Sequence, residues 1–130
     1  MDIVIDASAI LAVIVAEPER DRIVQVTTGH ALVGPGSIPW EIGNAFSSML
    51  KQQRLALEES TRGLSVFEGV PIRYLAVDME NALSIAVQEN LYAYDAYFLD
   101  CAIRHAAPLL TLDRVLKRAA ESLGVHVLEI

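Results

Sequence analysis

The chain has 130 residues, 53% of them hydrophobic and 21% charged, which excludes a disordered protein and fits a single domain spanning residues 1–130. The net charge of −7 disfavours a protein that holds nucleic acid mainly through a basic face. The chain has a single cysteine, Cys101, which excludes an intrachain disulfide and a cysteine-rich zinc site. The start of the chain is acidic and does not resemble a secretory signal, so we expect a cytoplasmic protein.

Strands and helices alternate along the first half of the chain. Glu17-Pro18 breaks the first apolar stretch, and Pro39 opens a later helix in its favoured first turn. The apolar run 7–16 is too short to cross a bilayer, so no membrane contact is expected. The predicted elements are a strand at 3–5, helices at 8–15 and 22–28, a strand at 31–33, and helices at 39–53 and 57–67.

The second half continues the alternation, and Cys101 lies in an apolar helix where we expect a small core residue. The predicted elements are a strand at 72–77, helices at 79–89 and 94–105, a strand at 108–112, a helix at 114–123 and a strand at 125–128. Aliphatic strands joined by helices pair in parallel, with right-handed crossovers. The predicted fold is therefore α/β, a three-layer α/β/α sandwich with a central parallel sheet of about five strands.

Four acidic residues are predicted at one edge of this sheet. Asp6 and Asp113 directly follow the first and fourth strands, and Glu41 lies in the first turn of the helix after the second strand. Asp95 begins the helix that runs back to feed the fourth strand, so it starts from the same edge. Ligands of open parallel sheets bind at the carboxyl ends of the strands. We call these residues the edge acids: Asp6, Glu41, Asp95 and Asp113.

Each edge acid also has a simpler interpretation, because a carboxylate at the start of a helix caps free N–H groups and complements the helix dipole. Together, however, like charges crowded in one crevice repel each other unless a cation neutralises them. Hard oxygen ligands without Cys or His favour Mg²⁺, Mn²⁺ or Ca²⁺ over zinc. The joint pattern therefore favours a metal site over four independent caps.

Three polar residues accompany the edge acids. Ser8 lies two residues after Asp6, Thr111 lies two residues before Asp113, and Asn44 is one helical turn beyond Glu41. These side chains are suited to orient the carboxylates or hold a metal-bound water. The alternative is that Ser8 and Thr111 satisfy the local backbone and that Asn44 is an ordinary surface residue.

The chain resembles the PIN-domain nucleases and, among them, the VapC-type toxins of toxin–antitoxin pairs. The resemblance covers essentially the whole chain, and no single motif would establish it. The segments that carry it are Ile3-Val4-Ile5-Asp6-Ala7-Ser8-Ala9, Pro39-Trp40-Glu41-Ile42-Gly43-Asn44-Ala45, Tyr94-Asp95-Ala96 and Leu110-Thr111-Leu112-Asp113.

This resemblance implies an endoribonuclease that binds one or two divalent cations, Mg²⁺ or Mn²⁺, through the edge acids. It also implies a homodimer and a small antitoxin whose C-terminal segment blocks the site. If dimers form, we expect the exposed apolar residues of the first helices to make the contact. Asp100 departs from the family pattern, and we expect it to be a surface acid rather than a fifth ligand.

Few basic residues are placed to contact RNA. Arg114, Lys117 and Arg118 lie on the helix that follows Asp113 and are candidates for contacts with RNA phosphates, or else form a solvated helix face. Lys51 and Arg54 are expected to be solvated cations at a helix end.

Three other protein classes also have acids at strand ends, but this chain lacks residues that each of them requires. A haloacid-dehalogenase-like phosphatase requires an acid at position 8, where this chain has Ser8. An integrin-like adhesion site requires a serine at position 10, where this chain has Ile10. A phospho-receiver domain requires an acidic pair and a Lys after the fifth strand, and both are missing here. The remaining alternative is a catalytically inert PIN-fold module that sequesters RNA or a protein partner.

Overall fold

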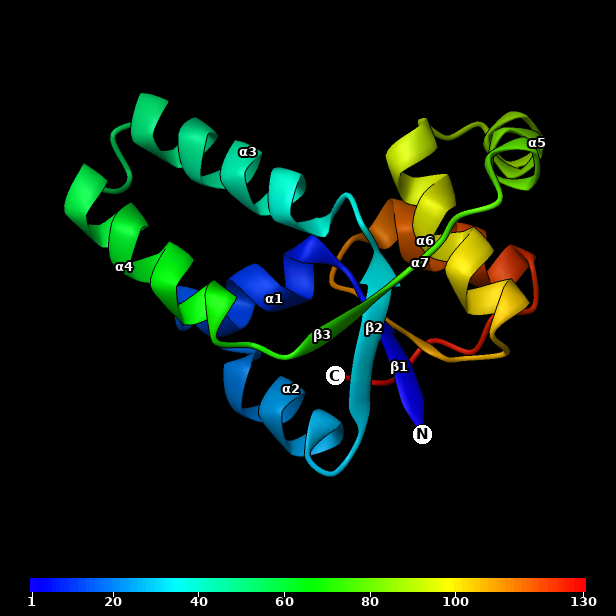
Figure 1. The fold of residues 1–130 in the computed structure, drawn as a ribbon, viewed down its shortest axis with the longest axis horizontal. Coiled ribbons are helices and arrows are strands. Elements are labelled where there is room, and N and C mark those ends of the chain that lie inside the picture. Colours follow the sequence, from blue (N-terminus) through cyan, green and yellow to red (C-terminus); the bar gives the residue numbers. More distant parts are fainter.

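Four parallel strands form the centre of the molecule, and seven helices flank them (Figure 1). The computed structural model describes all residues, 1–130. In chain order the elements are β1 (Asp2–Ile5), α1 (Ala7–Ile14), α2 (Arg20–Thr27), β2 (Ala31–Pro35), α3 (Ile38–Lys51), α4 (Leu57–Glu68), β3 (Ile72–Leu75), α5 (Met79–Glu89), α6 (Ala93–Arg104), β4 (Leu109–Leu110) and α7 (Arg114–Ser122).

The strand order in the sheet is β3-β2-β1-β4, and every pair is parallel. Ile3 pairs with Leu32 of β2 on one side, and Ile5 pairs with Leu110 of β4 on the other. The chain therefore builds outward from β1 through β2 to β3, and later returns to the other side of β1 as β4. This reversal makes the crevice between β1 and β4 the topological switch point, where open parallel sheets bind ligands.

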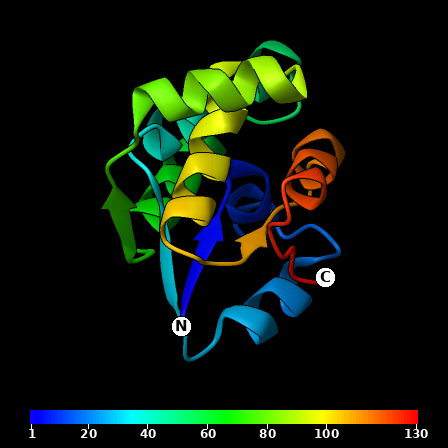
Figure 2. The same ribbon diagram turned by 90° about the vertical axis from the view of Figure 1, so that its right-hand side faces the viewer.

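The helices form the two outer layers that the alternating pattern predicts. Helix α1 packs against α2, α3 and α4, and these helices lie together on one side of the sheet (Figure 1). Helix α6 packs against α5 and also contacts β1 and β2, and Figure 2 shows it in front of the strands. The predicted three-layer α/β/α architecture is confirmed. No helix is long and apolar enough to cross a membrane.

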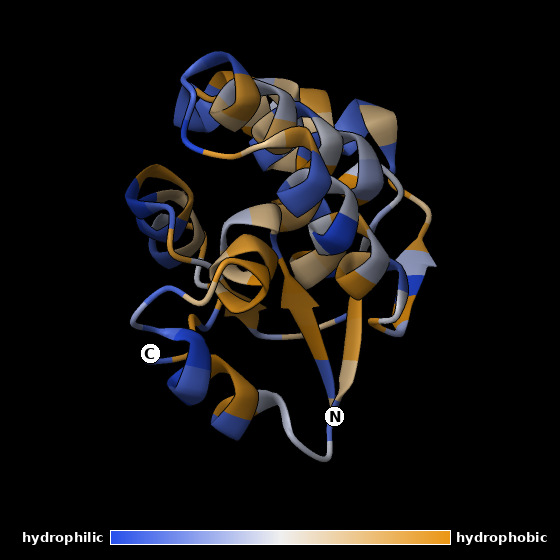
Figure 3. Cartoon of the chain, turned by 90° about the vertical axis from the view of Figure 1, so that its left-hand side faces the viewer, coloured by the Kyte–Doolittle hydropathy of each residue, from blue (hydrophilic) through white to orange (hydrophobic).

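One cluster of 25 buried hydrophobic residues forms the core. Ile3, Val4 and Ile5 of β1 are all buried, as expected for a parallel strand with helices on both faces, and Figure 3 shows the central strands β1 and β2 mostly in hydrophobic colours. Burying each such side chain stabilises the fold by about 1.5–3 kcal/mol. Cys101 is buried in this core as predicted, and burial raises the pKa of its thiol to about 11, so it is unreactive.

The fifth strand predicted at residues 125–128 is reduced to a single bridge, in which Val127 pairs with Leu109. The backbone of Leu109 exchanges hydrogen bonds with His126 and Leu128, and no longer ladder forms. The reason is that β4 has only two residues, because the chain turns away at Thr111 to begin the approach to α7. The sheet therefore has four strands rather than about five.

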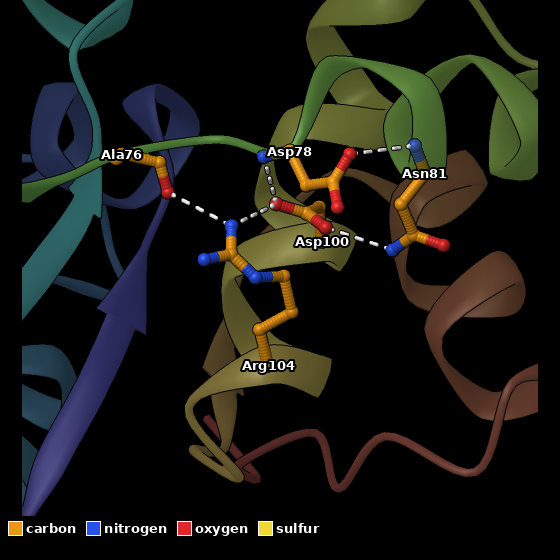
Figure 4. Close-up of polar contacts among 5 residues, drawn as sticks. All are labelled: Ala76, Asp78, Asn81, Asp100 and Arg104. Carbon is orange, nitrogen blue, oxygen red and sulfur yellow. Dashed lines mark hydrogen bonds and ion pairs between the residues drawn. The ribbon is translucent and has the colours of Figure 1, made fainter.

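The expectation that Asp100 is a surface acid is wrong, because its side chain is 0% exposed. Figure 4 shows its polar contacts. One carboxylate oxygen accepts hydrogen bonds from the Asp78 N–H (3.0 Å) and the Arg104 guanidinium (3.2 Å). The other accepts from Asn81 Nδ2 (2.8 Å). A buried carboxylate is tolerated when such partners replace water. We call Asp78, Asn81, Asp100 and Arg104 the Asp100 cluster; it joins α6 to the start of α5.

The first helices bury part of their apolar side chains, and the dimer contact expected at their exposed apolar residues stays a prediction. Ile10 and Ala12 of α1 and Ile23 of α2 are buried in the core, and Val24 is the only large apolar residue of these helices that is exposed. Leu11, Val13 and Ile14 of α1 and Val26 of α2 are partly exposed. The exposed apolar side chains are concentrated on other helices, chiefly α4 and α5.

Candidate metal centre

Asp6 lies directly after β1, at the switch point, and is almost completely buried. Its Oδ1 accepts hydrogen bonds from Ser8 Oγ (2.7 Å) and from the Ala9 N–H (3.1 Å), and the latter bond caps helix α1. Its Oδ2 accepts from Thr111 Oγ1 (2.6 Å). Burial raises the pKa of Asp6, the hydrogen bonds oppose this effect, and the charge of Asp113 adds to it.

Ser8 and Thr111 link the ends of β1 and β4 through their hydroxyl groups. While Ser8 Oγ donates to Asp6, it accepts from the Leu112 N–H at 2.9 Å. Thr111 Oγ1 likewise accepts from the Asp113 N–H at 3.0 Å. Both hydroxyls therefore donate to the Asp6 carboxylate, and each also accepts a hydrogen bond from a backbone N–H of the segment that follows β4.

Asp113 follows β4 and caps helix α7. Its Oδ1 accepts from the N–H groups of Val115 (2.8 Å) and Leu116 (3.2 Å), whereas its Oδ2 accepts no hydrogen bond within the protein. The side chain is exposed at the rim of the crevice. One oxygen therefore serves the helix, and the other is available to a ligand.

Glu41 and Asp95 lie in the first turns of α3 and α6 and are both partly buried. Glu41 Oε2 accepts a hydrogen bond from Ser37 Oγ at 2.8 Å, and Asp95 accepts none. Burial is the main cause that raises the pKa of Glu41 to about 7, and the charges of Asp6 and Asp95 raise it further. Burial, followed by the charge of Asp113, also raises the pKa of Asp95.

The edge acids therefore repel one another, although they come from four separate segments of the chain. The two ion pairs of the structure, Arg73–Asp2 and Arg104–Asp100, involve none of them. Partly buried carboxylates without a cation are unfavourable, and a bound divalent cation would remove this cost. The donor set consists of hard oxygens, which fits Mg²⁺ or Mn²⁺.

As the side chains stand, no group of three or more acidic, His or Cys side chains is arranged to hold a metal ion. Asp6, Glu41 and Asp113 instead take hydrogen bonds from hydroxyl or backbone donors. The structure thus brings the four acids to one crevice and couples them electrostatically, without closing them around a common centre.

Asn44 is exposed and makes no hydrogen bond to the edge acids. It lines a hollow of about 490 Å³ together with Trp40, Glu41 and Tyr94, and we call this the aromatic hollow. The sequence interpretation missed Trp40 and Tyr94. Their position directly before two of the edge acids, Glu41 and Asp95, is the signal that could have identified them.

Arg114, Lys117 and Arg118 are exposed on α7 and form no ion pair. Their spacing places them on one face of the helix, with Arg114 next to the rim. Arg118 also lines a separate hollow beside Leu91, away from the edge acids. Of the three, Arg114 is therefore the best placed to meet a substrate at the crevice.

Comparisons with known proteins agree with this architecture. The family model described as PIN domain matches residues 3–122, a range that includes all four edge acids. A comparison with curated protein sequences gives no match.

The fold is also similar to three solved structures. PAE2754 from Pyrobaculum aerophilum aligns with a TM-score of 0.73 and 23% identity over 95% of both chains. VapBC2 from Rickettsia felis, crystallised with a DNA fragment from their promoter, aligns with a TM-score of 0.67 and 16% identity over 99% of this chain and 98% of that one. FitAcB from Neisseria gonorrhoeae aligns with a TM-score of 0.50 and 17% identity over 98% and 96%. At these identities the similarity establishes the fold.

Proposed function

The chain belongs to the PIN domain family, and we propose that it is a metal-dependent endoribonuclease that hydrolyses RNA phosphodiester bonds. The observation that carries this proposal is the set of edge acids at the switch point. Asp6, Glu41 and Asp95 are at least partly withdrawn from water, burial and the charges of neighbouring edge acids raise their pKa values, and no basic side chain pairs with any of the four. Four carboxylates kept in this state are suited to bind a cation and a phosphate together.

Each edge acid has a distinct role in this proposal. Asp6 and Asp113 bind the cation from the two strands that flank the switch point, and Asp95 binds it from α6. Glu41 either joins them or positions the attacking water, with its carboxylate held by Ser37. Bound Mg²⁺ or Mn²⁺ supplies positive charge to the scissile phosphate and makes water more acidic.

Ser8 and Thr111 keep the Asp6 carboxylate in one orientation by donating to its two oxygens. Arg114, at the start of α7, contributes positive charge where the phosphate backbone would enter the crevice. A divalent cation at the crevice and this arginine supply local positive charge to the phosphate, although the net charge of the chain is −7.

We further propose that the chain is the toxin of a toxin–antitoxin module, held inactive in the cytoplasm by a small antitoxin, and that it forms a homodimer. The fold shared with VapBC2 and FitAcB supports this proposal. Met79, Leu83 and Val87, spaced four residues apart along α5, are all exposed and offer an apolar stripe for such an association.

The test is cleavage of labelled total cellular RNA by the purified chain, freed of any bound partner, in Mg²⁺, in Mn²⁺ and in EDTA. We expect discrete fragments that require metal and disappear in Asp95→Asn. Glu80→Gln is the matched control, because Glu80 is also an acid in the first turn of a helix but lies exposed on α5.

The alternative is an inert PIN-fold module that only binds RNA or a protein. The same assay separates the two, since such a module yields no fragments in any metal and its binding tolerates Asp95→Asn.

A further inference from the structure

Two large aromatic side chains are exposed beside the edge acids. Trp40 is 75% exposed and Tyr94 is 56% exposed, and each directly precedes an edge acid in the sequence. Both line the aromatic hollow together with Glu41, so the hollow opens next to the proposed chemistry. Its volume of about 490 Å³ lies within the range of roughly 300–1,000 Å³ typical of small-ligand sites.

The Tyr94 ring is held in place by a neighbour. It packs edge-on against Tyr97, one turn away on α6, with ring centroids 5.7 Å apart and an interplanar angle of 81°. Trp40 lies in the first turn of α3, which is anchored by the buried Ile38 and Ile42 on either side of it. Both rings are therefore presented on rigid helix starts rather than on loops.

We propose that Trp40 and Tyr94 form a stacking site for a nucleobase of single-stranded RNA beside the bond that is cut. This inference rests on the proposed ribonuclease function and names the part of the substrate that the aromatic hollow binds. The exposed Asn44 amide, which has no partner in the protein, is placed to hydrogen bond with the edge of the stacked base.

The charge of the molecule favours a base over a phosphate as the ligand of this hollow. The net charge is −7, and Glu41 in the wall of the hollow would repel a phosphate. Stacking on an aromatic ring needs no positive charge and is available to every base that is not already paired in a duplex. The aromatic hollow therefore selects single strands and supplies affinity that basic residues do not.

A protein ligand for the aromatic hollow is less well supported. The hollow shares Glu41 with the crevice of the edge acids, so a substrate bound for cleavage must pass over it. The apolar stripe of α5 offers a partner protein a separate surface made of aliphatic residues.

The first test uses the intrinsic fluorescence of the protein, since Trp40 is the only tryptophan. In EDTA, which prevents metal-dependent cleavage, an oligoadenylate RNA of about eight nucleotides should quench the Trp40 emission. An abasic ribose-phosphate oligomer of the same length and charge should quench it far less. Equal effects of the two oligomers, or no effect of either, would overturn the stacking site.

The second test measures RNA affinity by the anisotropy of the labelled oligoadenylate. Trp40→Ala and Tyr94→Ala should each weaken binding by about 5- to 100-fold, whereas Trp40→Phe and Tyr94→Phe should retain most of it. Tyr74→Ala is the matched control, because Tyr74 is an exposed tyrosine on β3 at the far edge of the sheet. Unchanged RNA affinity in both alanine variants, with loss of binding to a co-purifying small protein, would assign the hollow to a protein partner and refute the proposal.

These outcomes are separable from failure of the proposed function. Quenching by the base-bearing RNA without any cleavage by the wild type would support the stacking site and reject the nuclease. Cleavage by the wild type with KM unchanged in Trp40→Ala and Tyr94→Ala would support the nuclease and reject the stacking site.

Discussion

The fold contains two groups of acidic side chains, and their surroundings differ. In the Asp100 cluster, one fully buried carboxylate accepts three hydrogen bonds, one of them from the guanidinium of Arg104 (Figure 4). At the switch point, four carboxylates lie together, and none has a basic partner. A buried acid whose charge is compensated within the chain holds structure together, whereas acids left uncompensated point to a ligand that the chain does not supply.

Asp113→Asn tests whether the edge acids bind a ligand, and it has the largest expected effect. Asparagine caps a helix about as well as aspartate, so α7 should keep its cap while the charge is lost. We expect cleavage to fall by at least about 100-fold with the unfolding free energy in EDTA nearly unchanged. Cleavage at the wild-type rate would show that Asp113 is a cap and no more.

Asp100→Ala tests whether the Asp100 cluster stabilises the fold. It leaves the Asp78 N–H and the Asn81 amide without their acceptor, and should reduce the free energy of unfolding by about 2–4 kcal/mol in urea titrations. Metal affinity of the folded fraction should not change. If metal affinity fell while stability held, the two groups of acids would not be separate.

Thr111→Val preserves side-chain shape but removes the hydroxyl that donates to Asp6 and accepts from the Asp113 N–H. We expect Mg²⁺ affinity, measured by calorimetry, to fall about 10-fold. Thr61→Val on the exposed face of α4 is the control. An effect of equal size in both variants would indicate a general loss of stability instead of a role at the edge acids.

The smallest expected effect is on the pH dependence of stability. Because the folded pKa values of Asp6, Glu41 and Asp95 are raised, the folded protein binds more protons than the unfolded chain between the ordinary pKa of these acids and about 7. Their contribution to stability is therefore lost as the pH rises through this window. In EDTA we expect Tm to be a few °C lower at about pH 8 than at about pH 5.5.

Two variations of this melting experiment identify its cause. Adding Mg²⁺ should remove most of the difference, since a cation stabilises the charged carboxylates. Glu41→Gln should flatten the profile in EDTA, because the pKa of Glu41 is raised to about 7, within the pH range of the experiment. A profile that is the same in Glu41→Gln and in the wild type would place the pH dependence elsewhere in the molecule.

Structural features that depend on residues close together in the sequence could be predicted. The β-branched run before Asp6 forms β1, Pro39 lies in the first turn of α3, and the helix predicted at 79–89 is α5. The meeting of the edge acids at one edge followed from the direction of parallel strands alone. Local periodicity and topology therefore sufficed for the layers and for the candidate site.

What the sequence did not reveal depends on contacts between distant segments. The burial of Asp100 requires α5 to lie against α6, although Arg104 four residues later was a usable signal of a paired acid. The predicted fifth strand is reduced to one bridge because its neighbour β4 ends at Leu110. The apolar pattern of α1 and α2 does not show which of their faces the sheet covers, so the residues left for a dimer contact could not be named from the sequence.

The hydroxyl bridge between Ser8, Thr111 and Asp6 has a consequence for the order in which the protein is assembled. Asp6 and Thr111 are separated by 105 positions along the chain, so their hydrogen bond closes a longer loop than any other hydrogen bond of the protein. Closing such a loop is slow relative to local helix formation. A chain still emerging from the ribosome therefore exposes Asp6 long before Thr111 exists, and the crevice is completed only after the segment that contains Thr111 has been made.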